Sequence, residues 1–165
     1  MRQAVLAVLF VGLCSSAYAE SAKPMAIEVF PFELEDKSAG AGIIEPDDYD
    51  KRYLSEAAQV TKDMLAQSGR YSLVEVPTVD SQPVAPHGLR NCGGCEGKIA
   101  KDHGASLALL GVVTRINRTE HTLFIRILDV DTGQPVAMGF TDLRMGANHA
   151  WPRSAKWVMK NRILQ

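Results

Sequence analysis

The chain has 165 residues, with 18 basic and 19 acidic side chains and a formal net charge of −1. Charge this evenly balanced argues against a general nucleic-acid binder, because such proteins carry a basic face. A chain of this length buries enough surface to fold as a single domain without help from a disulfide.

The first nineteen residues are predicted to be a secretory signal peptide. Arg2 gives a positive start, residues 4–14 form an apolar run, and Ala17 and Ala19 are the small residues that a signal peptidase reads. We expect cleavage after Ala19, leaving residues 20–165 as one secreted domain in the periplasm. No later apolar stretch is long enough to be a transmembrane segment.

Export decides how the cysteines are interpreted. Cys14 lies in the signal peptide, and lipidation there is disfavoured because Leu13 stands where that chemistry needs a small residue. The mature chain would hold only Cys92 and Cys95, in an oxidising compartment where thiols tend to pair.

The mature chain begins with a strand and a loop. Residues 26–34 alternate partway between apolar and polar side chains, which predicts a strand with Phe30, Phe32 and Leu34 on one face. Pro31 is expected at an edge or at the strand end, because proline cannot donate a hydrogen bond to a neighbouring strand. An acidic, glycine-containing loop follows to residue 50.

A helix and a short strand come next. Apolar side chains recur every three or four positions over residues 51–68, which predicts a helix that Gly69 ends. Residues 71–76 alternate as a strand, and residues 77–91 are rich in proline and form an excursion.

The second half of the chain supplies a meander between two helices. The predicted elements are a short helix over residues 96–103, antiparallel strands over 107–116, 122–130 and 136–145, and a last helix over 151–164. The resulting order, β-α-β-α-β-β-β-α, is typical of an α/β (α+β) domain with a single mixed sheet and helices mainly on one face.

Several segments together resemble a known family. They are residues 27–32, 68–74, 92–96, 103–106, 111–113 and 132–133, with Trp151 and Arg153 at the head of the last helix. The chain resembles a family of small secreted bacterial proteins of unknown function. More distantly it is similar to the amino-terminal domain of TolB and to the curli-secretion lipoprotein fold. Those relatives are assembly or interaction modules, so the resemblance implies a binding role and transfers no catalytic residue.

The sharpest local feature is the CGGC sequence formed by Cys92 and Cys95 with two glycines between them. A structural disulfide that fixes the start of the second helix is the favoured interpretation, although so short a loop makes a weak brace. A redox-active pair, a zinc site completed by His87 and His103, and an intermolecular bond are the alternatives. Covalent haem is disfavoured, since Glu96 occupies the position of the required histidine.

Two acidic clusters could in principle hold a hard cation. The first consists of Glu45, Asp47, Asp48 and Asp50. We interpret it as a solvated loop in which Asp50 caps the first helix. The second, Asp129 and Asp131 with Gly133, lacks the other ligands of a calcium loop and is interpreted as a hairpin turn.

The histidines stand near no recognised nucleophile, so no catalytic residue is predicted. His149, Trp151 and Arg153 could form a partner surface at a helix start. The alternative places Trp151 over the sheet edge and Arg153 in solvent, and His121 is expected to be an ordinary residue at a strand end.

These features predict a non-enzymatic periplasmic module, without a cofactor, that binds an envelope protein or assists envelope assembly. The alternative function is thiol–disulfide or metal handling through Cys92 and Cys95.

Overall fold

The computed structural model describes residues 23–43, 45–76, 88–143 and 150–165. They form one six-stranded mixed sheet in the order β3-β1-β4-β5-β6, with β2 also paired to β4. The strands are β1 (Met25–Val29), β2 (Glu33–Asp36), β3 (Tyr71–Leu73), β4 (Leu107–Arg115), β5 (His121–Asp129) and β6 (Pro135–Leu143). The helices are α1 (Asp48–Gln67), α2 (Cys95–Asp102) and α3 (Trp151–Val158), with a 3₁₀ turn η1 (Leu89–Asn91) before α2 and a π turn η3 (Met159–Ile163) after α3. The predicted fold class is confirmed.

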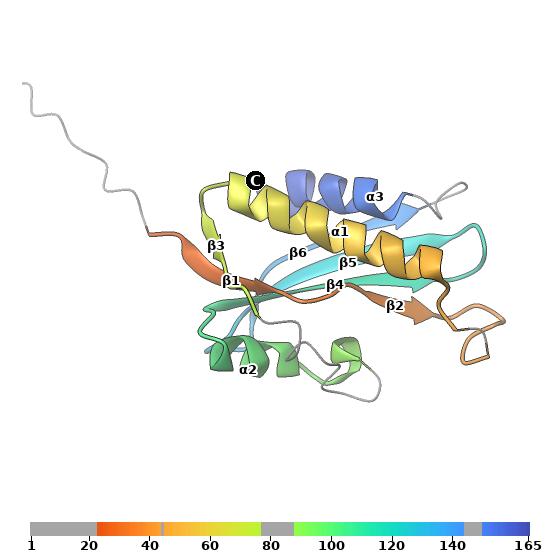
Figure 1. Ribbon diagram of the computed structural model, residues 1–165, viewed down its shortest axis with the longest axis horizontal. Coiled ribbons are helices and arrows are strands. Elements are labelled where there is room, and N and C mark those ends of the chain that lie inside the picture. Colours follow the sequence, from red (N-terminus) through yellow and green to blue (C-terminus); the bar gives the residue numbers. More distant parts are fainter. Residues whose placement is uncertain (1–22, 44, 77–87, 144–149) are drawn as a thin grey trace, which may run out of the picture.

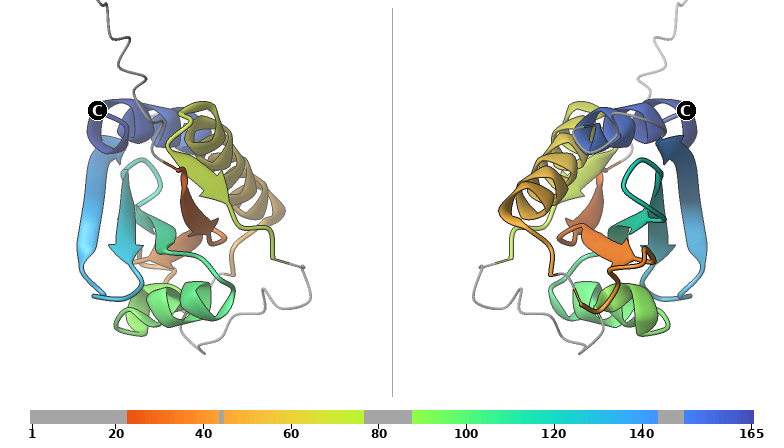
Figure 2. Two further views of the ribbon diagram at one scale, coloured as in Figure 1. Left: turned by 90° about the vertical axis from the view of Figure 1, so that its left-hand side faces the viewer. Right: turned by 90° about the vertical axis from the view of Figure 1, so that its right-hand side faces the viewer.

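The sheet divides the interior into two cores. α1 and α3 cover one face, and α2 lies against the other (Figures 1 and 2). The main core lies under α1 and α3 and includes Leu65, Ile125 and Trp151. A smaller second core, which includes Phe30, Leu89 and Leu110, lies under α2. Among the described residues, no helix is long and apolar enough to cross a membrane.

The first predicted strand is split in two. β1 and β2 both run parallel to β4, but β1 pairs with its first half and β2 with its second. The chain is interrupted around Pro31, which cannot supply a ladder hydrogen bond. Phe30 therefore lies in the second core and Phe32 in the main core, so the expectation that they share one face was wrong.

Phe32 also explains a glycine in the middle of β4. A Cβ atom added to Gly111 would lie 2.4 Å from the Phe32 ring. The aromatic ring thus packs directly on the backbone of β4. At this point β4 stops pairing with β1 and begins to pair with β2.

α1 begins earlier than the sequence pattern predicts, and a different residue caps it. Asp47 is the N-cap, and its Oδ1 accepts a hydrogen bond from the Asp50 backbone N–H at 2.8 Å. Asp50 Oδ2 accepts one from the Asp47 backbone N–H at 3.3 Å, which completes a reciprocal capping box. Asp50 is thus the third residue of the helix rather than its cap.

Arg115, the last residue of β4, joins four elements. Its Nη1 lies 3.2 Å from Asp36 Oδ2 at the end of β2, and its Nη2 lies 2.5 Å from Asp50 Oδ1 in the first turn of α1. Its Nε donates to His121 Nε2 at the start of β5, at 3.4 Å. The guanidinium thereby fixes the first turn of α1 against one end of the sheet.

His121 lies at a strand end as predicted, at the start of β5, but it is a buried core residue and not an ordinary one. Its side chain is 1% exposed, and its ring packs edge-on against Trp151 with centroids 5.8 Å apart. Burial, followed by the neighbouring Arg115 cation, lowers the pKa of His121 below its ordinary value of 6.5, although Asp50 and Asp36 oppose the shift.

We predict that His121 makes stability sensitive to mild acid. The unfolded chain takes up a proton near pH 6.5, before the folded chain does. The stability that His121 contributes is therefore complete above this pH and is lost as the pH falls towards its lower folded pKa, by up to about 1.4 kcal/mol per pH unit. Urea unfolding of wild type and His121→Gln across this range should show a stability difference that changes with pH. A difference that stays constant would contradict the prediction.

Arg115→Met should destabilise the domain by about 3 kcal/mol, because it leaves the Asp36 and Asp50 carboxylates without their shared cation. Urea unfolding at neutral pH measures this loss. Arg153→Met is the matched control, since Arg153 is exposed on α3, and it should change stability by no more than about 0.5 kcal/mol. Equal losses in the two variants would exclude a special role for Arg115.

Candidate functional site

Two neighbouring features occupy the face of the sheet opposite α1 and α3. The first, here called the cysteine corner, consists of Cys92, Cys95 and Glu96 with Arg126 of β5. The second, here called the β6 stripe, consists of Val136, Met138 and Phe140 on β6 with Phe124 on β5. Arg126 and Met138 are directly opposite each other in the β5–β6 pairing, so the two features adjoin.

In the cysteine corner the two sulfur atoms are bonded to each other. Cys92 follows η1, and Cys95 is the first residue of α2. Gly93 and Gly94 have φ values of +70° and +100°, a region that side chains rarely adopt, which explains why glycines separate the cysteines. The backbone N–H of Cys95 also donates to Cys92 Sγ at 3.2 Å.

A carboxylate from β2 holds the same segment independently of the disulfide. Glu33 accepts hydrogen bonds from the backbone N–H of Leu89 at 2.6 Å and of Arg90 at 3.1 Å. It also pairs with Arg90 Nη1 at 3.0 Å. The disulfide is therefore one of two braces on this segment.

Glu96 is buried beside the disulfide, and its two oxygens face different groups. One carboxylate oxygen, Oε1, forms an ion pair with Arg126 Nη2. The other, Oε2, lies 3.8 Å from Cys92 Sγ. The side chain of Glu96 is 0% exposed, so the carboxylate is enclosed between a cation and a sulfur atom. Sequence reasoning used Glu96 only to exclude haem and missed this arrangement.

Of the two histidines in the alternative zinc set, the structure describes only His103, which contacts a different residue. His103 Nδ1 lies 2.9 Å from Glu28 Oε2 at the far end of α2. Among the residues that the structure describes, the close group of ligand atoms here comes from Cys92, Cys95 and Glu96, without His103. His87 lies outside the described residues.

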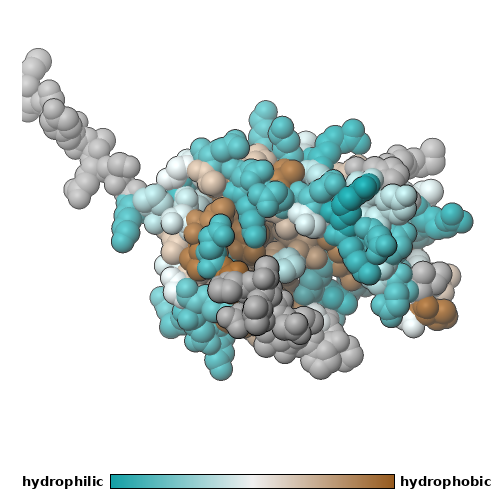
Figure 3. All heavy atoms as spheres, in the orientation of Figure 1, coloured by the Kyte–Doolittle hydropathy of each residue, from teal (hydrophilic) through white to brown (hydrophobic). Residues whose placement is uncertain are grey.

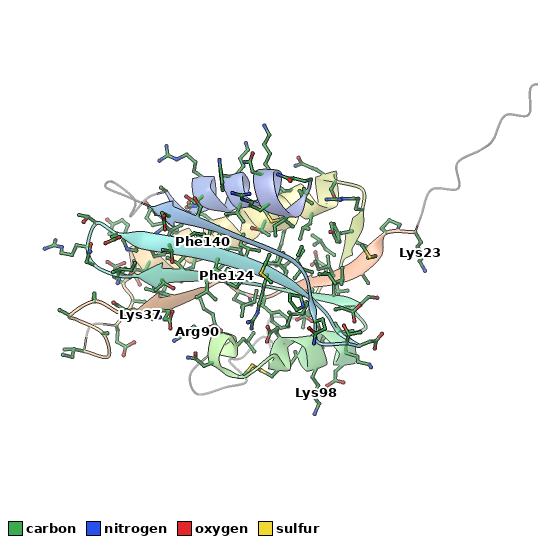
Figure 4. The ribbon with its side chains drawn as sticks, turned by 180° about the vertical axis from the view of Figure 1, so that it is seen from behind. Lys23, Lys37, Arg90, Lys98, Phe124 and Phe140 are labelled. Carbon is green, nitrogen blue, oxygen red and sulfur yellow. A yellow bond between two sulfur atoms is a disulfide. The ribbon has the colours of Figure 1, made fainter. Side chains whose placement is uncertain are left out.

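The β6 stripe is an apolar surface on the last strand of the sheet. Val136, Met138 and Phe140 are 57%, 54% and 53% exposed. Phe140 lies directly across from Phe124 in the β5–β6 pairing, and Figure 4 shows the two side chains on neighbouring strands. The opposite side of the molecule differs, because hydrophilic side chains cover much of α1 there and apolar side chains show mainly in the area below it (Figure 3).

The possible partner surface at the head of the last helix would lack Trp151, while Arg153 lies in solvent as the alternative has it. Trp151 is 0% exposed and packs edge-on against Tyr53 and His121 in the main core. A large aromatic ring at the start of an amphipathic helix satisfies the hydrophobic effect better inside the core than in solvent. Arg153 is exposed, and His149 lies outside the described residues.

The acidic clusters have structural partners. Asp47 and Asp50 form the capping box of α1, while Glu45 and Asp48 are exposed. Asp129 Oδ1 accepts hydrogen bonds from the backbone N–H of Asp131 and Thr132, which forms the predicted hairpin turn between β5 and β6.

Several solved structures share similarity with this chain. The chain is similar to the lipoprotein GNA1162 from Neisseria meningitidis, at 19% identity and a TM-score of 0.52 over 76% of this chain and 84% of that one. It is also similar to the LpoB C-terminal domain from Escherichia coli, at 17% identity and a TM-score of 0.51 over 77% and 88%. TolB from Acinetobacter baumannii matches at 10% identity and a TM-score of 0.46, over 83% of this chain and 27% of that one.

The similarities to GNA1162 and to the LpoB domain establish a shared fold and nothing about activity. No curated protein sequence matches the chain significantly. A family model described as "Protein of unknown function (DUF2380)" matches residues 25–163. Because that match spans most of the sequence, the chain belongs to this family, DUF3280.

Proposed function

We propose that this chain is an exported, non-enzymatic binding module of the bacterial envelope, and that the β6 stripe is its docking surface. The observation that carries the proposal is an exposed apolar surface on an unprotected sheet edge. The signal-peptide pattern and a fold shared with a protein described as a lipoprotein support the envelope location.

The edge of the sheet at β6 is suited to receive another strand. β6 is the terminal strand in the sheet order and pairs with β5, and no described strand lies on its outer side. Its outward-facing backbone groups are available for hydrogen bonds to an added strand. Residues 135–141 contain no charged side chain, although natural edge strands usually carry charges that block such pairing.

The chemistry of the stripe specifies its partner. The partner is a protein that contributes an extended, uncharged segment with apolar side chains at alternate positions, which would cover Phe140 and Met138. Asp142 ends the stripe, is exposed, and has no ion-pair partner among the described residues. Charge complementarity therefore favours a lysine or arginine in the partner opposite Asp142.

Export places this surface among envelope proteins. We predict that the purified native protein begins at Glu20, because the signal peptidase pattern ends at Ala19. Amino-terminal sequencing of protein recovered from the periplasmic fraction checks this. An intact initiator methionine together with recovery in the cytosol would contradict it.

Phe140→Lys should weaken partner binding by at least about tenfold, since it places a charge among the apolar side chains of the stripe. A photoreactive amino acid at Met138 would capture the partner in living cells, and mass spectrometry would identify the crosslinked peptide. We expect the peptide to come from a protein segment that is uncharged over at least about five residues, the usual length of a strand. Asp142→Lys should also reduce the yield of the crosslinked product, because it would repel the basic residue expected in the partner.

Ile43→Lys is the matched control, because Ile43 is 82% exposed in a loop away from the sheet edge. It should leave crosslinking unchanged, and circular dichroism should show that all variants are folded. Crosslinking of the chain only to a second copy of itself would overturn the proposal. Equal losses in Phe140→Lys and Ile43→Lys would do the same.

A further inference from the structure

The cysteine corner contains groups that a purely structural disulfide would not need. Glu33 already holds η1 through two backbone hydrogen bonds, so the segment is fixed without the disulfide. Glu96 is enclosed next to the disulfide, although a buried carboxylate is costly unless both of its oxygens have partners. Arg126 satisfies one oxygen. The other faces Cys92 Sγ, which carries no hydrogen while it is in the disulfide.

Reduction would supply the missing donor. A reduced Cys92 has an S–H group that can donate to Glu96 Oε2, the oxygen now 3.8 Å from its sulfur atom. The enclosed carboxylate thus favours the dithiol form over the disulfide form. It is also placed to accept the proton that Cys92 must lose before it can attack another sulfur atom.

The two cysteines have different surroundings, which assigns them different roles. Cys95 is the first residue of α2, where the positive end of the helix dipole favours a thiolate. Cys92 precedes the helix and faces the negative charge of Glu96, which disfavours a thiolate. Cys95 is therefore the better initial nucleophile, and Cys92 is the better resolving thiol.

We propose that Cys92 and Cys95 form a thiol–disulfide exchange site in which Cys95 attacks a partner disulfide and Glu96 accepts the proton of Cys92. This activity is independent of docking at the β6 stripe and goes beyond it. In the first step the Cys95 thiolate attacks a disulfide R–S–S–R′. A bond from Cys95 Sγ to one partner sulfur forms, and R′–S⁻ leaves.

In the second step Cys92 resolves the mixed disulfide. Cys92 passes its proton to Glu96 Oε2 and attacks Cys95 Sγ, so that the Cys92–Cys95 bond forms and the bond from Cys95 to the partner sulfur breaks. The departing R–S⁻ then accepts the proton that Glu96 holds. The partner disulfide gains two electrons and the cysteine pair loses two. The reverse sequence, with a dithiol as the reductant, regenerates the reduced pair.

The test uses the reduced mature protein and glutathione disulfide as the probe, with mass spectrometry of acid-quenched samples. Cys92→Ser should accumulate a stable glutathione adduct on Cys95, whereas Cys95→Ser should form its adduct more slowly. In the wild type the mixed disulfide should be short-lived, and Glu96→Gln should prolong its lifetime at neutral pH by at least about tenfold.

A second variant removes the ambiguity that an unpaired Arg126 would create. Glu96→Leu with Arg126→Leu replaces the enclosed ion pair by apolar side chains, a change that folded proteins generally tolerate. Like Glu96→Gln, it should slow the attack of Cys92 on the mixed disulfide. In both variants the rate of this attack should rise with pH as an ordinary thiol ionises, while in the wild type the rate should depend less on pH. Asp102→Asn, an exposed change at the other end of α2, is the control and should behave as wild type.

Three results would overturn the proposal. The first is a reduced wild type that does not react with glutathione disulfide. The second is an adduct that forms faster on Cys92 in the Cys95→Ser variant than on Cys95 in the Cys92→Ser variant. The third is a resolution rate that is the same in the wild type and in both variants that lack the carboxylate.

Discussion

The arrangement of the domain depends on one partly buried cation at the end of its central strand. Arg115 contacts carboxylates from β2 and α1 and the imidazole of β5, so four elements share one guanidinium. Its planar group offers several donors in a fixed geometry, which a lysine could not reproduce. With the first turn of α1 held in this way, the rest of the helix lies along the sheet together with α3 and encloses Trp151.

The two faces of the sheet have different roles: one carries the main core, and the other carries the candidate functional features. The face under α1 and α3 is filled by the main core, which includes the Trp151 ring. The other face is only partly covered by α2, so β5 and β6 keep the apolar stripe beside the cysteine corner. A domain that covered both faces fully would leave the β6 stripe no surface on which a partner could dock.

Local sequence patterns predicted the helices and strands well, because helical spacing and strand alternation depend only on residues that are close in the sequence. The helix from residue 51, the meander and the last helix were all recovered. The pattern could not place Phe30 and Phe32 in different cores, since that depends on how the chain resumes after Pro31. Nor could it find the Arg115 cluster, whose carboxylates lie 79 and 65 residues away in sequence. Glu96 and Arg126, 30 residues apart, were missed for the same reason. The sequence does contain a signal for the β6 stripe. In the alternating segment around Phe124, apolar residues occur on both faces, which indicates that the second face is apolar as well.

The placement of the last helix has a consequence for when the protein can fold. α3 and η3 supply Trp151, Val158, Met159 and Ile163 to the main core, and a Cβ atom at Gly139 of β6 would lie 2.6 Å from Val158. The backbone carbonyl of Gln165, beyond η3, accepts a hydrogen bond from Arg70 next to β3 at the opposite edge of the sheet. The C-terminal segment thus spans the sheet as a strap. The main core therefore cannot close without residues 151–165, so the two edges of the sheet become fixed to each other only when this segment docks.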